Sequence, residues 1–224
     1  MVANGRKTST RGRPPKTAAD GGAPTNRNGA NEARWQEILE GAAEVFFEKG
    51  YAGTSIQDVA DRVSLLKGSL YHYISTKEDL LFAILKEVQK AGIGVVETAG
   101  AREGDARTRV REFVRDYALL CIRTRIKASV FDRDFHSLTG ERRAQLITER
   151  DVYDEFLRGL ITEGIADGSF SAEVDPVVVG NVIFQMVNSI YHWYSPRGKR
   201  SPEEIAGQIA DFAIGGLEQA GIDA

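Results

Sequence analysis

The sequence predicts an all-α protein in which a small N-terminal three-helix unit precedes a larger helical bundle. After residue 30, apolar residues recur in long segments at the i, i+3, i+4, i+7 spacing of amphipathic helices. Helix-start patterns, in which Ser, Thr or Asp precedes Glu, Gln or Pro at capping distance, stand at the heads of several segments. No segment of useful length alternates as a strand does. We therefore expect an arm over residues 1–30, a helix-turn-helix domain over 31–76 and a bundle over 77–224.

The overall composition indicates a globular protein with buried cores. Hydrophobic residues make up 42% and charged residues 27% of the 224-residue chain. Cys121 is the only cysteine, which is usual in a reducing cytoplasm. The N-terminal segment lacks the apolar centre of a secretory signal, and the apolar runs are far shorter than the ~20 residues of a membrane-spanning helix. The sequence thus predicts a cytoplasmic protein without a membrane partner.

Residues 1–30 carry a strong positive charge. Six Lys or Arg residues stand against Asp20 alone, which gives this segment +5 and leaves −8 for the rest of a chain whose total is −3. The segment is rich in Gly, Pro, Thr, Asn and Ala, and it cannot bury enough apolar surface to offset its ordering entropy. We expect a disordered basic arm on an acidic body, which indicates a polyanionic partner.

Two capping boxes mark the second and fourth helices. Thr54 and Gln57 fit the T-x-x-Q pattern at the start of the second helix. Ser75 and Glu78 fit the same pattern at the start of the fourth helix, which we expect to end near residue 91. Further along the chain, Asp-Pro at 175–176 and Ser-Pro-Glu-Glu at 201–204 predict the starts of two more helices.

A short helix over residues 67–74 has an unusual outer surface. At about 100° per residue, Leu70 and Ile74 face the core. The opposite line and its flanks carry a glycine, two polar side chains and two tyrosines: Gly68, Ser69, His72, Tyr71 and Tyr73. A glycine permits close backbone approach, polar side chains reach base edges, and tyrosine hydroxyls donate to phosphates, as in a recognition helix in the major groove of double-stranded DNA. Lys77 adds a cation at the next helix. The alternative is that the tyrosines pack against neighbouring helices and the glycine has no special role.

The stretch FFEKGYAGTSIQDVADRVSLLKGSLYHYISTKEDLL resembles the N-terminal DNA-binding domain of TetR-family transcriptional regulators. The resemblance covers about residues 32–85 without gaps and includes the patterns G-[ST]-L-Y-x-[YH] and S-x-K-E-D-L. It implies DNA contacts by seven residues: Gln57, Lys67, Ser69, Tyr71, His72, Tyr73 and Lys77. Two positions depart from the family, because Ser64 stands where glycine is usual and Leu66 where a polar cap is usual. Either Ser64 accepts an unusual backbone geometry or the turn differs.

The arm contains a second short pattern, TRGRPPK, which resembles the core of an AT-hook. Arg11 and Arg13 would then lie along a narrow A·T-rich minor groove, which attracts arginine electrostatically. The alternative is a solvated basic tail that binds DNA only through counterion release.

The C-terminal half resembles, less specifically, the branch of the family whose members often sense acyl-CoA thioesters of fatty acid or steroid breakdown. The resemblance is carried by EGIADGSFSAEVDP, WYSPRGKRSPEEIA and the pair Gly215-Gly216. Large aromatic residues exceed what a helical bundle needs for packing, and apolar pockets are typically lined this way. The candidate ligand-binding residues are Phe113, Tyr117, Phe131, Phe135, Tyr153, Phe184 and Tyr191. Arginines of this half either meet coenzyme A phosphates or are solvated helix faces.

The last two long helices are too apolar for lone surfaces, which predicts a homodimer. The candidate interface residues are Val178, Val182, Met186 and Ile190 on one helix and Ile209, Phe212 and Leu217 on the other. A two-fold dimer requires a palindromic operator. The sequence therefore predicts a dimeric, ligand-responsive repressor that releases DNA when a hydrophobic effector binds, with an acyl-CoA thioester as the first candidate.

Two other functions remain open at this point. An effector-independent DNA-binding protein would lack a pocket in its C-terminal domain. An all-helical metal-dependent enzyme would need clustered Glu and His, such as E-x-x-H pairs, which the chain lacks. His136 has Asp132 and Asp134 nearby, but zinc sites need three or four convergent ligands. We predict no catalytic residue, no metal and no cofactor.

Overall fold

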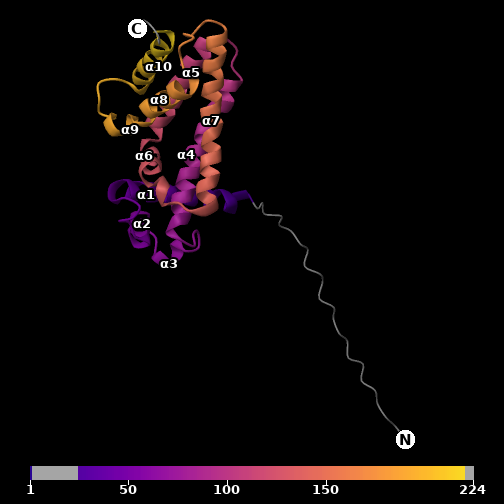
Figure 1. Cartoon of the computed structure of the whole chain (residues 1–224). Coiled ribbons are helices and arrows are strands. Elements are labelled where there is room, and N and C mark those ends of the chain that lie inside the picture. Colours follow the sequence, from indigo (N-terminus) through magenta and orange to yellow (C-terminus); the bar gives the residue numbers. More distant parts are fainter. Residues whose placement is uncertain (2–24, 220–224) are drawn as a thin grey trace.

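The computed structural model describes Met1 and residues 25–219, and every regular element in this part of the chain is helical. The elements are α1 (Thr25–Lys49), α2 (Ile56–Arg62), α3 (Lys67–Leu70), α4 (Lys77–Gly100), α5 (Ala106–Arg123), α6 (Arg125–Asp134), the 3₁₀ turn η1 (Phe135–Ser137), α7 (Gly140–Ala166), α8 (Pro176–Asn188), α9 (Ile190–Trp193) and α10 (Pro202–Gln219). The all-α class is confirmed. Figure 1 shows α1, α2 and α3 gathered at one end and α5, α8 and α10 at the other, with α4 and α7 running between them. None of the described helices combines the length and apolarity needed to cross a membrane.

Helix α1 begins at Thr25, earlier than the boundary expected at residue 31. Residues 25–30 therefore continue the first helix instead of belonging to a disordered arm. Residues 2–24 of the expected arm, including Arg11 and Arg13, lie outside the described residues.

Helix α2 is capped one residue later than predicted. The Ser55 hydroxyl accepts from the backbone N–H of Asp58, and the Asp58 carboxylate accepts from the backbone N–H of Ser55. Thr54 is buried instead, and its hydroxyl donates to the carbonyl oxygen of Gly50 at 2.7 Å. Gln57 therefore does not cap the helix.

Helix α4 shows the same one-residue shift and is longer than predicted. Its capping box joins Thr76 and Asp79, where Ser75 and Glu78 were expected. The helix continues past residue 91 to Gly100. By contrast, the caps predicted at 175–176 and 201–204 are confirmed: the Asp175 side chain accepts from the first backbone N–H groups of α8, and Ser201 and Glu204 exchange capping bonds before α10.

Two hydrophobic cores divide the structure. One joins α5, α7, α8 and α10. The other joins α1, α2, α3 and the first half of α4, and it also takes in Val130 of α6, Leu138 between η1 and α7, and Leu146 of α7. Parts of the C-terminal bundle therefore complete the core of the helix-turn-helix domain. Because interiors are close-packed, a shift of α6 or α7 must be felt by this domain.

Candidate nucleic-acid interface and effector cavity

The turn between α2 and α3 has the unusual geometry that the sequence implied. Ser64 has a φ of +54°, the left-handed region that glycine adopts more readily. Leu66 occupies the N-cap position of α3, makes no side-chain cap, and is 80% exposed. Helix α3 begins at Lys67, where the predicted span of residues 67–74 also begins.

Helix α3 is shorter than the predicted 67–74 span. Regular helix ends at Leu70, and the chain continues as a turn in which the backbone N–H groups of His72 and Tyr73 bond to carbonyls three residues back. Leu70 and Ile74 are buried, as predicted. Gly68 and His72 are exposed on the outside, with Ser69 half-buried beside them. Tyr71 is 46% exposed on the flank.

Tyr73 takes the structural role that was the alternative for the tyrosines. Its ring stacks on that of Trp35 in α1, with centroids 6.3 Å apart and planes 9° apart. The side chain is half-buried. Tyr73 therefore packs the turn after α3 against α1.

Lys77 points inward, contrary to the phosphate contact that the sequence suggested. Its Nζ donates to the carbonyl oxygens of Tyr51 and Thr54, each at 2.7 Å, and lies 4.4 Å from the Tyr51 ring centroid. The ammonium group thus ties the start of α4 to the turn before α2. Gln57, in contrast, is exposed on α2, where its side-chain amide donates to Asp61 at 2.7 Å.

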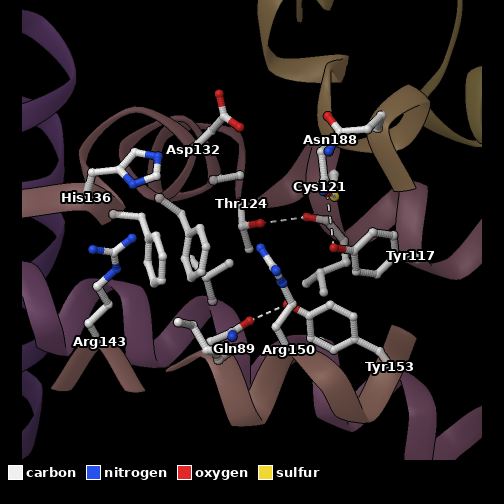
Figure 2. A pocket seen from close by; sticks show the side chains of 18 residues that line it. Gln89, Tyr117, Cys121, Thr124, Asp132, His136, Arg143, Arg150, Tyr153 and Asn188 are labelled. Carbon is white, nitrogen blue, oxygen red and sulfur yellow. Dashed lines mark hydrogen bonds between the residues drawn. The ribbon is translucent and has the colours of Figure 1, made fainter. Parts of the chain in front are cut away.

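A cavity of about 360 Å³ lies in the C-terminal half among α4, α5, α6, α7 and α8. Figure 2 shows Gln89, Tyr153, Tyr117, Cys121 and Asn188 around one part of it, with His136 and Arg143 at the other. The first part is buried, apart from the half-buried Asn188, whereas His136 and Arg143 are exposed. The cavity therefore has an inner end and a solvent-exposed end.

The predicted ring residues divide into those that line the cavity and those that support it. Tyr117, Phe131, Phe135 and Tyr153 line it. Phe113 and Phe184 are buried behind Tyr117, with ring centroids 6.1 and 5.3 Å away, and do not reach the cavity. Tyr191 also lies off the cavity, but its hydroxyl donates to the lining residue Asp132 at 2.6 Å.

Sequence reasoning missed the polar part of the lining. Gln89, Thr124, Arg150 and Asn188 all line the cavity. Gln89 is almost fully buried, and its amide donates to the carbonyl oxygen of Leu146 at 2.6 Å. One signal was available, since Gln89 lies four residues after Leu85 and three before Gly92 on the apolar stripe of α4. A polar residue on such a stripe needs a buried partner.

The Cys121 thiol is buried, and the acidic residues near His136 are hydrogen-bonded within the chain. Burial raises the pKa of Cys121 to about 12, so the thiol is neutral at ordinary pH. Asp134 is buried, pairs with Arg133 and accepts from the backbone N–H of Tyr51. In the described part of the chain, no three His, Cys, Asp or Glu side chains converge as metal ligands would.

A DNA-binding helix-turn-helix places its second helix in the major groove, and a cavity between the helices of a bundle can hold a small ligand, so the fold is that of a DNA-binding protein with a ligand pocket. Residues 38–84 match the family described as "Bacterial regulatory proteins, tetR family". Residues 103–217 match the family described as "Tetracyclin repressor-like, C-terminal domain".

Individual relatives agree with these family matches. The transcriptional repressor KstR2 of Rhodococcus jostii (strain RHA1) is 26% identical over 195 residues, which are 87% of this chain and 96% of that protein. The TetR-family regulator PfmR from Thermus thermophilus is 32% identical with a TM-score of 0.74, covering 81% of this chain and 99% of that one. The structure of AibR in complex with isovaleryl coenzyme A and operator DNA is 32% identical with a TM-score of 0.72, covering 83% and 98%.

The chain belongs to the TetR family of bacterial regulatory proteins. It is a DNA-binding transcriptional regulator and not an enzyme.

Proposed function

We propose that this protein is a dimeric repressor that binds a palindromic operator through α2 and α3 and releases it when an amphipathic effector fills the cavity. The observation that carries this proposal is the composition of one helix. The first half of α4 contributes Leu80, Leu81 and Ile84 to the core of the helix-turn-helix domain. Its middle contributes Val88 and Gln89 to the cavity wall. An effector that moves α4 must therefore move the DNA-binding domain as well.

The DNA-contacting surface in this proposal is the exposed edge of α3 with the flank of α2. Ser69 and His72 are assigned to base edges, Lys67 and Tyr71 to phosphates, and Gln57 to the DNA backbone beside α2. Gly68 has open space around it, since a Cβ built there would meet nothing within 4 Å. Both predicted roles of Arg11 and Arg13 stay proposals for experiment. The two arginines either bind in a minor groove or belong to a basic tail that attracts DNA only electrostatically.

A second route from the cavity to the DNA-binding domain runs through α6. Asp132 lines the cavity. The next residue, Arg133, donates to the carbonyl oxygens of Phe46 and Phe47 at the end of α1. Asp134 follows and accepts from the backbone N–H of Tyr51. Three consecutive residues thus connect the effector site to the turn between α1 and α2.

Two arginines that line the cavity favour an anionic effector. Arg143 and Arg150 both line the cavity, and Figure 2 shows the Arg150 guanidinium projecting across it. The nearest carboxylate to Arg150 is that of Asp154, at 3.9 Å. The structurally similar AibR binds isovaleryl coenzyme A in its crystal structure. An acyl-CoA thioester, with its acyl group inside and its phosphates among arginines, is accordingly the first effector to test.

The dimer interface is proposed on the outer faces of α8 and α10. Val178 and Val182 are more than half exposed on α8, and Phe212 is 73% exposed on α10. A Cβ built at Gly216 would meet nothing within 4 Å, which leaves room for a second copy. Ile190 and Leu217, in contrast, are fully buried within one chain and cannot belong to this interface, contrary to the sequence-based expectation. Met186 and Ile209 are half-buried at its margin.

Neither alternative function has the same support. An effector-independent DNA-binding protein gives no reason for a cavity of about 360 Å³ with a polar inner wall. Membership in a family of transcriptional regulators rules out the metal-dependent enzyme.

The experiment that tests the proposal begins with an operator selected from a pool of random duplexes. The selected sequence should be palindromic, because a two-fold dimer presents two identical recognition surfaces. Acyl-CoA thioesters and their free acids are then screened for a rise in melting temperature. A ligand that stabilises the protein should weaken operator binding. A non-palindromic consensus, or stabilising ligands that all leave operator binding unchanged, would contradict the proposal.

A further inference from the structure

The inner end of the cavity is polar where a site for a saturated hydrocarbon would be apolar. The Tyr117 hydroxyl donates to the side-chain oxygen of Asn188 at 3.1 Å. The Tyr153 hydroxyl donates to the side-chain oxygen of Gln89. Burial raises the pKa of Tyr117 well above that of a free tyrosine, so its hydroxyl keeps its proton. The two pairs come from four different helices, α4, α5, α7 and α8, and converge on the same end of one cavity.

These pairs leave hydrogen-bonding capacity that faces the cavity. Each phenol oxygen gives its one proton to an amide and keeps lone pairs with which it can accept. The amide nitrogen of Asn188 makes no hydrogen bond among the described residues. The inner end therefore offers the two N–H groups of the Asn188 amide and two hydroxyl acceptors beside the buried thiol of Cys121.

A bound hydrocarbon would cover these groups without pairing them. Water can satisfy them while the cavity is empty, but a saturated chain would exclude that water and leave a buried donor unpaired. Sites that hydrogen-bond a ligand oxygen discriminate strongly against the analogue that lacks it, because their own polar groups are then left without partners. The polar inner end thus disfavours a saturated hydrocarbon, the ligand that a purely apolar pocket would prefer.

The size of the cavity places the polar contact at the far end of an acyl group. The volume of about 360 Å³ lies near the lower end of the ~300–1,000 Å³ that is usual for ligand pockets. A cavity of this size suits the acyl group of a thioester, whereas the larger coenzyme A moiety stays outside. The thioester end must then face the exposed Arg143, and the other end of the acyl group reaches Tyr117 and Asn188, beside which Figure 2 shows Arg150.

We infer that the effector is an acyl thioester whose acyl group carries an oxygen, as a ketone or hydroxyl, at the end remote from the thioester. A ketone accepts from the Asn188 amide nitrogen, and a hydroxyl can also donate to the oxygen of Tyr117. This inference rests on the proposed function, since it assigns the chemical class of the ligand that releases DNA.

Two matched pairs of thioesters test the inference with the full-length protein. One pair is decanoyl-CoA and 9-oxodecanoyl-CoA, and the other is 4-cyclohexylbutanoyl-CoA and 4-(4-oxocyclohexyl)butanoyl-CoA. Binding is measured by isothermal titration calorimetry and DNA release by fluorescence anisotropy. In at least one pair, the oxygenated thioester should bind at least about tenfold more tightly than its saturated partner, the change that one unpaired buried group produces.

The variant Tyr117→Phe/Asn188→Leu replaces both members of one polar pair with apolar groups of similar shape. It should lose the preference for the oxygenated thioester or reverse it. The single variant Tyr117→Phe, which removes one oxygen atom, serves the same purpose if the double variant does not fold. Circular dichroism and the melting temperature establish folding in each case.

The possible outcomes separate this inference from the proposed function. If the wild type binds the saturated thioesters as tightly as the oxygenated ones and they release DNA, the inference is wrong and the proposed function stands. If no thioester binds, both the inference and the acyl-thioester effector are wrong. If the wild-type preference persists unchanged in a folded variant, the polar pair has been assigned incorrectly.

Discussion

The ammonium group of Lys77 is held between the carbonyl oxygens of Tyr51 and Thr54, with the Tyr51 ring beneath it. These contacts join the first residue of α4 to the turn that orients α2. Lys77 therefore positions the helix-turn-helix and is not a free cation on the DNA surface. The sequence motif places Lys77 where the family has a phosphate contact. The direction of its side chain, which points into the protein, decides its role instead.

Replacing Lys77 by Met should lower stability more than it changes the electrostatics of DNA binding. The variant keeps the aliphatic stem and leaves two carbonyl groups without a charged donor, which should cost about 1–3 kcal/mol of unfolding free energy in urea denaturation. The matched control is Lys67→Met, since Lys67 is exposed on α3. The control should keep its stability and make the slope of log K against log salt shallower by about one. If instead Lys77→Met changed the salt slope and Lys67→Met lowered the stability, this account would be contradicted.

Gly68→Ala should separate folding from DNA binding. The added methyl group meets no atom within 4 Å in the free protein, and alanine is favoured over glycine in a helix by about 1 kcal/mol. The variant should therefore fold at least as well as the wild type. If the backbone at Gly68 approaches DNA closely, the methyl group should weaken operator binding by tenfold or more in an anisotropy titration. Gly159→Ala, on the exposed face of α7 with equally open space, should leave operator binding unchanged. Equal operator affinity in both variants would remove Gly68 from the interface.

A charge on the outer face of α8 or α10 should dissociate the dimer. Val182 is 59% exposed, and Phe212 lies on the neighbouring helix. Val182→Glu or Phe212→Glu places an unpaired carboxylate in the proposed interface, where its desolvation is costly. Sedimentation at micromolar concentration should show a dimeric wild type and monomeric variants with weakened operator binding. Val152→Glu, which alters an exposed valine of α7, should remain dimeric. A monomeric wild type would exclude this interface.

Asp79 should give the protein a distinct sensitivity to acid. Partial burial alone would raise the pKa of Asp79, but hydrogen bonds from the Arg142 guanidinium and from the backbone N–H groups of Thr76 and Ser75 outweigh it and lower the pKa to about 2. A carboxyl group whose folded-state pKa lies below its unfolded value stabilises the fold above the unfolded pKa. That stability is lost as pH falls from about 4 towards 2.

The substitution Asp79→Asn tests this linkage directly. The difference in unfolding free energy between wild type and variant should be largest above pH 4 and should shrink towards pH 2. Chemical denaturation at several pH values measures it. A difference that does not change with pH would mean that the Asp79 carboxylate contributes no charge-dependent stability.

The fold could be predicted from the sequence because its helix signals are local and repeated. Asp175 and Ser201 each precede a proline, which leaves few choices for the helix start, and both caps are confirmed. The predicted starts of α2 and α4 were each one residue too early, because two adjacent residues can each cap the helix. The choice between Thr54 and Ser55 depends on which hydroxyl is drawn into the core, and burial of Thr54 against Gly50 is a tertiary effect.

The cavity was only partly predictable for a similar reason. Aromatic residues on converging helices indicate that a pocket can form, but periodicity does not show which rings reach it. Phe113 and Phe184 face the same domain as Tyr117 and still pack behind it. The polar residues of the lining come from separate helices, and only the assembled fold brings Gln89 to Tyr153 and Asn188 to Tyr117.

The most direct test of the central claim is the operator affinity of the wild-type protein at saturating effector. Calorimetry first establishes that the effector is bound, and an anisotropy titration with the selected operator then gives the affinity with and without it. We expect at least a tenfold loss of affinity, which corresponds to about 1.4 kcal/mol of coupling between the two sites. Ala128→Phe, which places a ring in the cavity from α6, should abolish effector binding and with it the change in affinity. An effector that is bound in the cavity of the wild type and leaves operator affinity unchanged would contradict the claim that this cavity controls DNA binding.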